Sequence, residues 1–113
     1  MKKPDILRNQ QDFSRLYKKG KSSGSKYAVV LSIGNNLPYS RRAFLASKKV
    51  GNSVKRHRAV RLMREAFRQL EEQLPDGYDL LFIARSTVTE DNCKFADMKK
   101  SIEAALKRAD LLK

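Results

Sequence analysis

Apolar residues recur along the chain with two spacings, one typical of helices and one typical of strands. The first helical run has the i, i+3, i+4 spacing and comprises Phe13, Leu16 and Tyr17. Asn9 precedes this run and can cap free backbone amides, and Gly20 follows it as a residue that favours a helix end. We therefore expect a first helix from Asn9 to Gly20. The basic, Ser- and Gly-rich residues 18–26 are expected to form a loop.

Alternating and continuous apolar runs predict the strands. Residues 26–33 read as a strand, and one of its faces is expected to carry Tyr27, Val29 and Leu31. Residues 41–47 read as another strand, which is either whole or split, so the pattern leaves open whether two or three strands precede the middle of the chain. The nearly continuous apolar run over residues 78–86 predicts a strand that is covered on both faces.

The strongest helical pattern begins at Asn52 and extends to Leu74, which at 1.5 Å per residue is ~35 Å. One arc of this helix collects the apolar side chains Ala59, Val60, Met63, Ala66, Phe67, Leu70 and Leu74. The rest of the surface collects Lys55, His57, Arg58, Arg61, Arg64 and Arg68. Arg56 falls on the apolar arc, where it either projects past the core or packs its stem there. Glu65 follows Arg61 by four residues and is placed to hold it.

A final amphipathic helix is predicted over residues 94–111. With it, the elements follow the order helix, two or three strands, long helix, strand, helix, and we take the three-strand form, α-β-β-β-α-β-α. This order predicts an α+β fold in which the helices pack on one sheet, an α/β sandwich. The length of 113 residues suits a single domain over residues 1–113.

The excess of basic residues and its position in the chain indicate what kind of partner the protein binds. The chain holds 25 Lys and Arg against 12 Asp and Glu, a formal net charge of +13. Residues 41–68 alone hold ten bases and one acid, a net +9. Such a concentration indicates a polyanionic partner. Nucleic acid fits better than a membrane, because the basic segment has no Trp or Leu-rich face, and no apolar run approaches the ~20 residues of a membrane span. We expect a cytoplasmic protein.

Candidate chemistry is dominated by arginine. Guanidinium groups donate paired hydrogen bonds to phosphate oxygens and stay charged near neutrality. A second candidate surface is aromatic and comprises Phe13, Tyr17 and Tyr27, which can stack on bases, although composition alone favours a core role for them. Catalytic groups are scarce: His57 is the sole histidine, Cys93 is the sole cysteine and is expected to be semi-buried and unreactive, and no paired histidines or phosphate-binding glycine motif occurs. Four acids are expected to be solvated: Glu71, Glu72, Asp76 and Asp79.

The segment Ser47–Phe67, SKKVGNSVKRHRAVRLMREAF, closely resembles the signature of the bacterial ribonuclease P protein family. That family shows a Lys-Lys, Gly, Val start followed by an arginine-rich helix. Residues 12–20 and 78–85 resemble the family's first helix and last strand, so the likeness covers nearly the whole chain. Two positions depart from the family: His57 stands where Asn is usual, and Val60 stands where a basic residue is common.

The resemblance implies a left-handed crossover between parallel strands and a division of labour with RNA. In the family, a large catalytic RNA uses divalent metal, such as Mg²⁺, to cleave precursor tRNA at the 5′ end of the mature sequence. The protein is its non-catalytic subunit and needs no further protein partner. Carried over to this sequence, the residues that dock on the catalytic RNA are Lys48, Lys49, Asn52, Arg56, Arg58, Arg61 and Arg64. The residues that bind the single-stranded 5′ leader are Phe13, Tyr17 and Tyr27. No metal ligands on the protein can be assigned.

The alternative from a different class is a structural or chaperone-like RNA-binding protein of the ribosomal type. Such a protein would share the basic helix and would discriminate poorly between precursor and mature tRNA. A double-stranded-DNA binder is disfavoured because no second helix with a tight turn precedes the basic helix. A free-standing nuclease is disfavoured because neither a general base nor a carboxylate cluster for metal ions is evident.

Overall fold

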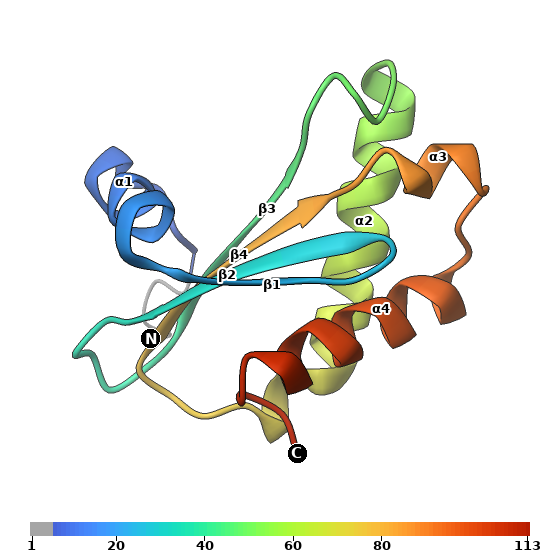
Figure 1. The fold of residues 1–113 in the computed structure, drawn as a ribbon. Helices are drawn as coiled ribbons and strands as arrows, with labels where there is room; N and C mark the ends of the chain where they lie inside the picture. Colours follow the sequence, from blue (N-terminus) through green and yellow to red (C-terminus); the bar gives the residue numbers. More distant parts are fainter. Residues whose placement is uncertain (1–5) are drawn as a thin grey trace.

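The computed structural model describes residues 6–113 and shows one four-stranded sheet between two layers of helices (Figure 1). The strands are β1 (Lys21–Gly24), β2 (Ala28–Gly34), β3 (Arg41–Ala46) and β4 (Tyr78–Ala84). The helices are α1 (Gln10–Lys19), α2 (Ser53–Leu70), α3 (Thr87–Glu90) and α4 (Phe95–Arg108), with a 3₁₀ turn, η1 (Glu71–Gln73), after α2. The predicted α+β class and element order are confirmed. The first five residues of the predicted domain lie outside the described residues.

The strands lie in the order β1-β2-β4-β3. β2 pairs antiparallel with both β1 and β4, whereas β3 pairs parallel with β4. A parallel pair needs a crossover, and α2 supplies it. Figure 1 shows this connection with the left-handed sense that the resemblance implies, against the right-handed sense of nearly all such connections.

Apolar side chains form a separate core on each face of the sheet. α2 and α4 cover one face, where Met63, Phe67, Phe82 and Ile102 belong to the larger cluster. α1 covers the other face, where the smaller cluster comprises Leu7, Leu16, Leu31, Ala43 and Leu81. β4 therefore contributes to both cores, as its continuous apolar run predicts.

The predicted loop over residues 18–26 is wrong over most of its length, because residues 18–19 belong to α1 and β1 occupies Lys21–Gly24. β1 carries no apolar alternation. It forms through ladder pairing with β2, in the register that sets Lys21 opposite Ser32 and Gly24 opposite Val29. β1 also settles the open question of strand number, since three strands precede α2. The short helix α3 was likewise absent from the expected elements.

Among the helices, the bounds of α2 and α4 differ most from the prediction. α2 ends at Leu70 instead of Leu74, because the chain tightens into η1 before Pro75. Its 18 residues give a length of ~27 Å in place of ~35 Å. α4 begins at Phe95, with Lys94 as its N-cap, and ends at Arg108.

Tyr27 does not share a sheet face with Val29 and Leu31, so that prediction is wrong. β2 begins only at Ala28, and Tyr27 packs in the core beneath α2 and α4 while Leu31 packs beneath α1. The Tyr27 hydroxyl donates to Asp91 Oδ2 at 3.2 Å, which ties the ring to the end of α3. The period-2 alternation cannot be extended to a residue that precedes the strand.

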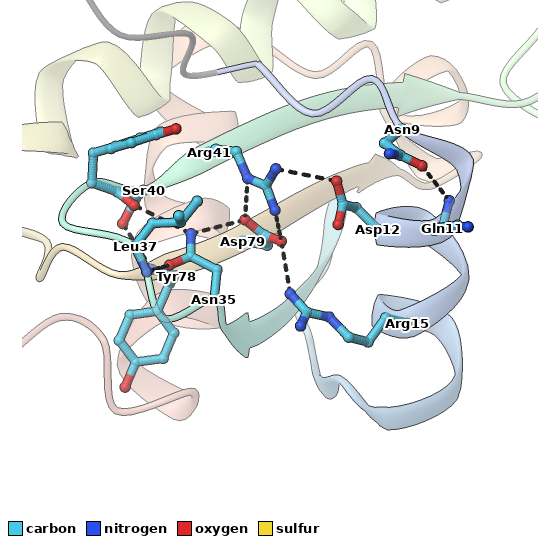
Figure 2. Close-up of polar contacts among 11 residues, drawn as sticks. Asn9, Gln11, Asp12, Arg15, Asn35, Leu37, Ser40, Arg41, Tyr78 and Asp79 are labelled. Carbon is cyan, nitrogen blue, oxygen red and sulfur yellow. Dashed lines mark hydrogen bonds and ion pairs between the residues drawn. The ribbon is translucent and has the colours of Figure 1, made fainter.

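Asp79, at the start of β4, is fully buried and is not the solvated acid that its sequence context suggests. Arg41 binds it through two hydrogen bonds, Nε to Oδ1 at 2.8 Å and Nη2 to Oδ2 at 2.7 Å (Figure 2). Asn35 donates to Oδ1 at 3.0 Å, and Arg15 donates to Oδ2 at 3.3 Å. Burial would raise the pKa of Asp79, but the hydrogen bonds from Arg41 and Asn35 outweigh burial and lower this pKa below its ordinary value.

We expect Asp79→Asn to lower the free energy of unfolding by about 3 kcal/mol, since it leaves the Arg41 guanidinium without its buried counter-charge. Urea titrations followed by circular dichroism measure this loss. Because the folded-state pKa is depressed, the advantage of the wild-type carboxylate is complete above about pH 4 and is lost as the pH falls through the folded pKa. Equal free energies of unfolding of the wild type and the variant at pH 7 would contradict the stabilising role of the Asp79 carboxylate.

Candidate nucleic-acid interface

In the segment before α2, two exposed lysines precede a buried residue, Val50. Val50 is 2% exposed and belongs to the larger core, and its carbonyl accepts a hydrogen bond from Thr89 Oγ1 at 2.6 Å. Lys48 and Lys49 lie on the exposed side of the same turn, which is closed by a hydrogen bond from the Val50 amide to the Ser47 carbonyl. The turn therefore holds both ammonium groups at the N-terminal end of α2.

Gly51 and Asn52 start α2 for separate reasons. Gly51 has a φ of 142°, a conformation that side chains rarely adopt, so glycine is required where the chain turns into the helix. Asn52 is the N-cap, and its Oδ1 accepts a hydrogen bond from the Lys55 amide at 3.0 Å. Asn52, a predicted RNA-docking residue, thus has a structural role in capping the helix, which typically contributes about 1 kcal/mol.

The exposed face of α2 carries one basic stripe, which we define as His57, Arg61, Arg64 and Arg68. These positions are spaced by four, three and four residues, so they lie along one side of the helix, and all four are exposed. From His57 to Arg68 the stripe is ~17 Å long at 1.5 Å per residue. Lys48 and Lys49 lie beyond the N-terminal end of the helix that carries it.

Arg58 lies off this stripe. It is half-buried, and its Nη2 donates to the Cys93 carbonyl at 2.6 Å, in the loop between α3 and α4. Arg58 therefore connects α2 to this loop through a hydrogen bond within the protein. Cys93 itself is fully buried, where a semi-buried side chain was expected, and burial raises the pKa of its thiol to about 11, so the thiol stays protonated near neutrality.

Arg56 also leaves the stripe, as its position on the apolar arc indicates. It is half-buried beside the end of β3, and its Nη2 lies 3.4 Å from Ser53 Oγ. The predicted ion pair between Arg61 and Glu65 is not formed in the described structure. Arg61 consequently projects from α2 with its guanidinium free of partners in residues 6–113.

A groove of about 610 Å³ runs between α2, β3 and the start of α1. It is lined, among others, by Phe13, Arg42, Leu45, Arg64 and Arg68. Aromatic rings anchor its arginines: Arg64 lies over the Phe44 ring at 5.7 Å, and Arg42 lies over the Phe67 ring at 5.2 Å. The groove thus has Arg64 and Arg68 of α2 on one side and Phe13 of α1 on the other.

The three predicted leader-binding residues are not brought together. Phe13 is half-buried in the groove, and Tyr17, one turn further along α1, is 58% exposed. Tyr27 is 8% exposed and packs on the opposite side of the sheet. Phe13 and Tyr17 can therefore present ring surface on the α1 side of the molecule, whereas Tyr27 cannot.

Other chemistries find little support in the described residues. Residues 6–113 contain no group of three or more His, Cys, Asp or Glu side chains placed to hold a metal ion. In the same residues no helix is both long and apolar enough to cross a membrane.

The model of the family described as Ribonuclease P matches residues 1–110 of this chain. The chain belongs to the ribonuclease P protein family. Two similar proteins, each named ribonuclease P protein component, come from Pelotomaculum thermopropionicum and Clostridioides difficile. The first is 39% identical over 98% of this chain and 97% of that protein. The second is 42% identical over 93% of this chain and 91% of that protein.

Solved structures of the ribonuclease P family have the same fold. The protein from Staphylococcus aureus at 2.0 Å superimposes with a TM-score of 0.85 at 30% identity, covering 98% of this chain and 100% of that one. The protein from Thermotoga maritima superimposes with a TM-score of 0.81 at 32% identity, covering 91% and 96%. The likeness therefore extends over the sheet and both helix layers.

Within this family fold, the sequence-predicted docking residues divide into two groups. Lys48, Lys49, Arg61 and Arg64 are exposed at α2 or its lead-in. Asn52, Arg56 and Arg58 make contacts within the protein. Arg68 lines the groove and belongs to the basic stripe, although it was not among the predicted docking residues. The spacing of Arg68 from Arg61 and Arg64 is the signal that places it there.

Arg58 and Arg61 provide a matched pair for separating stability from binding. We expect Arg58→Ala to lower the free energy of unfolding by about 1–2 kcal/mol, because it removes a charge-assisted hydrogen bond to the Cys93 carbonyl. Arg61→Ala should leave the free energy of unfolding within about 0.5 kcal/mol, since Arg61 is exposed. Thermal and urea unfolding measure both. Equal destabilisation by the two substitutions would contradict the distinction.

Proposed function

We propose that this chain is the protein subunit of a ribonuclease P holoenzyme and assists the removal of the 5′ leader from precursor tRNA. The observation that carries the proposal is the basic stripe on α2, together with the exposed Lys48 and Lys49 before this helix, on a chain that belongs to this family. The stripe and these lysines would dock on the catalytic RNA. Their role is to neutralise phosphates that otherwise repel one another.

The leader is proposed to bind on the α1 side. Phe13 lines the groove and Tyr17 is exposed on the same helix, so their rings can stack on bases of a single strand without reading sequence. Arg64 and Arg68 of the stripe line the same groove, so the leader would lie beside the surface that docks on the catalytic RNA. Tyr27 is buried away from this side, so we retain only Phe13 and Tyr17 as stacking residues.

Chemistry is proposed to reside in the RNA. Mg²⁺ is proposed to be held by the RNA, and residues 6–113 of this chain contain no group of three or more His, Cys, Asp or Glu side chains placed to hold a metal ion. In the RNA the ion would activate the attacking water and stabilise the charge on the cleaved phosphate. This chain would act by binding: its net charge of +13 lowers the repulsion between the catalytic RNA and the precursor.

The proposal is tested by adding the chain to a cognate ribonuclease P RNA and measuring precursor cleavage at low magnesium concentration. Stimulation of cleavage is expected, together with tighter binding of precursor than of mature tRNA. No stimulation by a folded protein would contradict the proposal. The structural or chaperone-like alternative predicts RNA binding without a preference for tRNA that carries a leader.

Arg61→Ala should weaken assembly with the catalytic RNA. Each lost phosphate contact lowers the slope of log affinity against log salt concentration by about one unit, or somewhat less for single strands. Filter binding across a salt series measures that slope. Lys107→Ala, an exposed change of equal charge on α4, is the control and should leave the slope closer to wild type.

Tyr17→Ala should weaken binding of precursor tRNA to the assembled holoenzyme by ~1–3 kcal/mol, the contribution of one stacked base. Tyr17→Phe keeps the ring and should bind nearly as wild type. Assembly with the catalytic RNA should be the same for all three proteins. A loss that is equal for precursor and leaderless tRNA would show that Tyr17 does not contact the leader.

A further inference from the structure

α1 carries the proposed stacking residues but is held to the sheet by little apolar contact. Of its ten residues only Leu16 is fully buried, while Phe13 is half-buried and Tyr17 is exposed. One buried leucine contributes ~1.5–3 kcal/mol to docking. Phe13 adds a partial contact with the smaller core, but apolar contacts are not directional and do not by themselves fix the rotation of a helix about its axis. A directional interaction is needed to set where Phe13 and Tyr17 point.

The ion cluster beneath α1 supplies that direction. Two acids and two arginines form it, Asp12 and Arg15 from α1, Arg41 from β3 and Asp79 from β4, and their formal charges cancel. Arg41 is the centre, because its Nε and Nη2 bind Asp79 while its Nη1 lies 3.1 Å from Asp12 Oδ2. Figure 2 shows the Arg41 guanidinium between the two carboxylates.

Both contacts from α1 come from one side of the helix. Asp12 and Arg15 are three residues apart, so they lie on adjacent turns, and both side chains point toward Arg41 and Asp79 (Figure 2). Phe13 follows Asp12 by ~100° around the helix axis, and Tyr17 lies one turn further along. Two polar contacts on one side therefore fix the rotation that brings Phe13 to the groove.

We propose that Asp12 and Arg15 are positioning residues, which act through the buried Arg41–Asp79 pair to hold Phe13 and Tyr17 in place for the RNA leader. The inference rests on the proposed function and adds to it that leader affinity depends on an ion cluster remote from the bases. Arg41 connects the two, because its planar guanidinium contacts Asp79 of the sheet and Asp12 of α1 at the same time.

The double variant Asp12→Asn, Arg15→Gln tests this inference. It removes both ionic contacts of α1, keeps the Arg41–Asp79–Asn35 contacts in the sheet, and leaves the net charge at +13 because one acid and one base are lost. In the assembled holoenzyme, the preference for precursor over leaderless tRNA should fall at least about fivefold, the equivalent of one weak base stack. Affinity for the catalytic RNA should stay within about twofold.

Two further variants control the experiment. Lys21→Gln with Asp110→Asn also keeps the net charge, and it removes an exposed ion pair of 3.6 Å away from the cluster, so it should retain the leader preference. Asp12→Glu with Arg15→Lys preserves both charges and should restore most of the preference. If the double variant unfolds at the assay temperature, Asp12→Asn alone carries the test with an expected loss of at least about twofold.

Each outcome is decisive. A folded double variant that keeps the full leader preference overturns the inference, as does an equal loss of affinity for precursor and leaderless tRNA. Failure of the proposed function gives a different result, since the wild-type holoenzyme itself would then show no leader preference. A selective loss in the double variant with recovery in the conservative variant supports the positioning role.

Discussion

Burial of β4 on both faces is the constraint on which the rest of the structure depends. Leu80 and Phe82 pack under α2 and α4, while Leu81 packs under α1. A strand covered in this way has no room for an unpaired polar group, yet its second residue is Asp79. The carboxylate is tolerated only because Arg41, Arg15 and Asn35 satisfy both of its oxygens. The central strand therefore determines the packing of β3 and also the docking of α1.

The same constraint explains the position of the arginine-rich helix. β3 pairs with β4 in parallel, so the chain must return along the length of the sheet before β4 can begin. α2 makes this return, and its buried side, with Met63 and Phe67, completes the larger core. The opposite side is left to the basic stripe. One helix thus connects the strands, fills the core and presents the proposed RNA-docking surface.

The sequence predicts those features that a local pattern determines. The buried arc of α2 follows from its period, and the buried β4 follows from its continuous apolar run. β1 could not be found in this way, because its Ser and Gly residues form a strand only through pairing with β2. The family resemblance assigned Arg58 to RNA docking, and the sequence could not reveal its contact with the Cys93 carbonyl, which lies 35 residues away. Asp79 was expected to be solvated for the same reason.

Partner availability also separates the arginines that build the fold from those available for RNA. Arg15 and Arg41 are ion-paired, and Arg58 binds a backbone carbonyl, so a phosphate would have to compete with an existing contact at each. Arg61 and Arg68 have no partner within residues 6–113. A phosphate can bind these two without breaking any contact of the described structure, and it releases counterions as it does so. Equal positive charge in the sequence therefore does not mean equal availability, and within residues 6–113 the stripe on α2 combines exposure with unpaired guanidinium groups at Arg61 and Arg68.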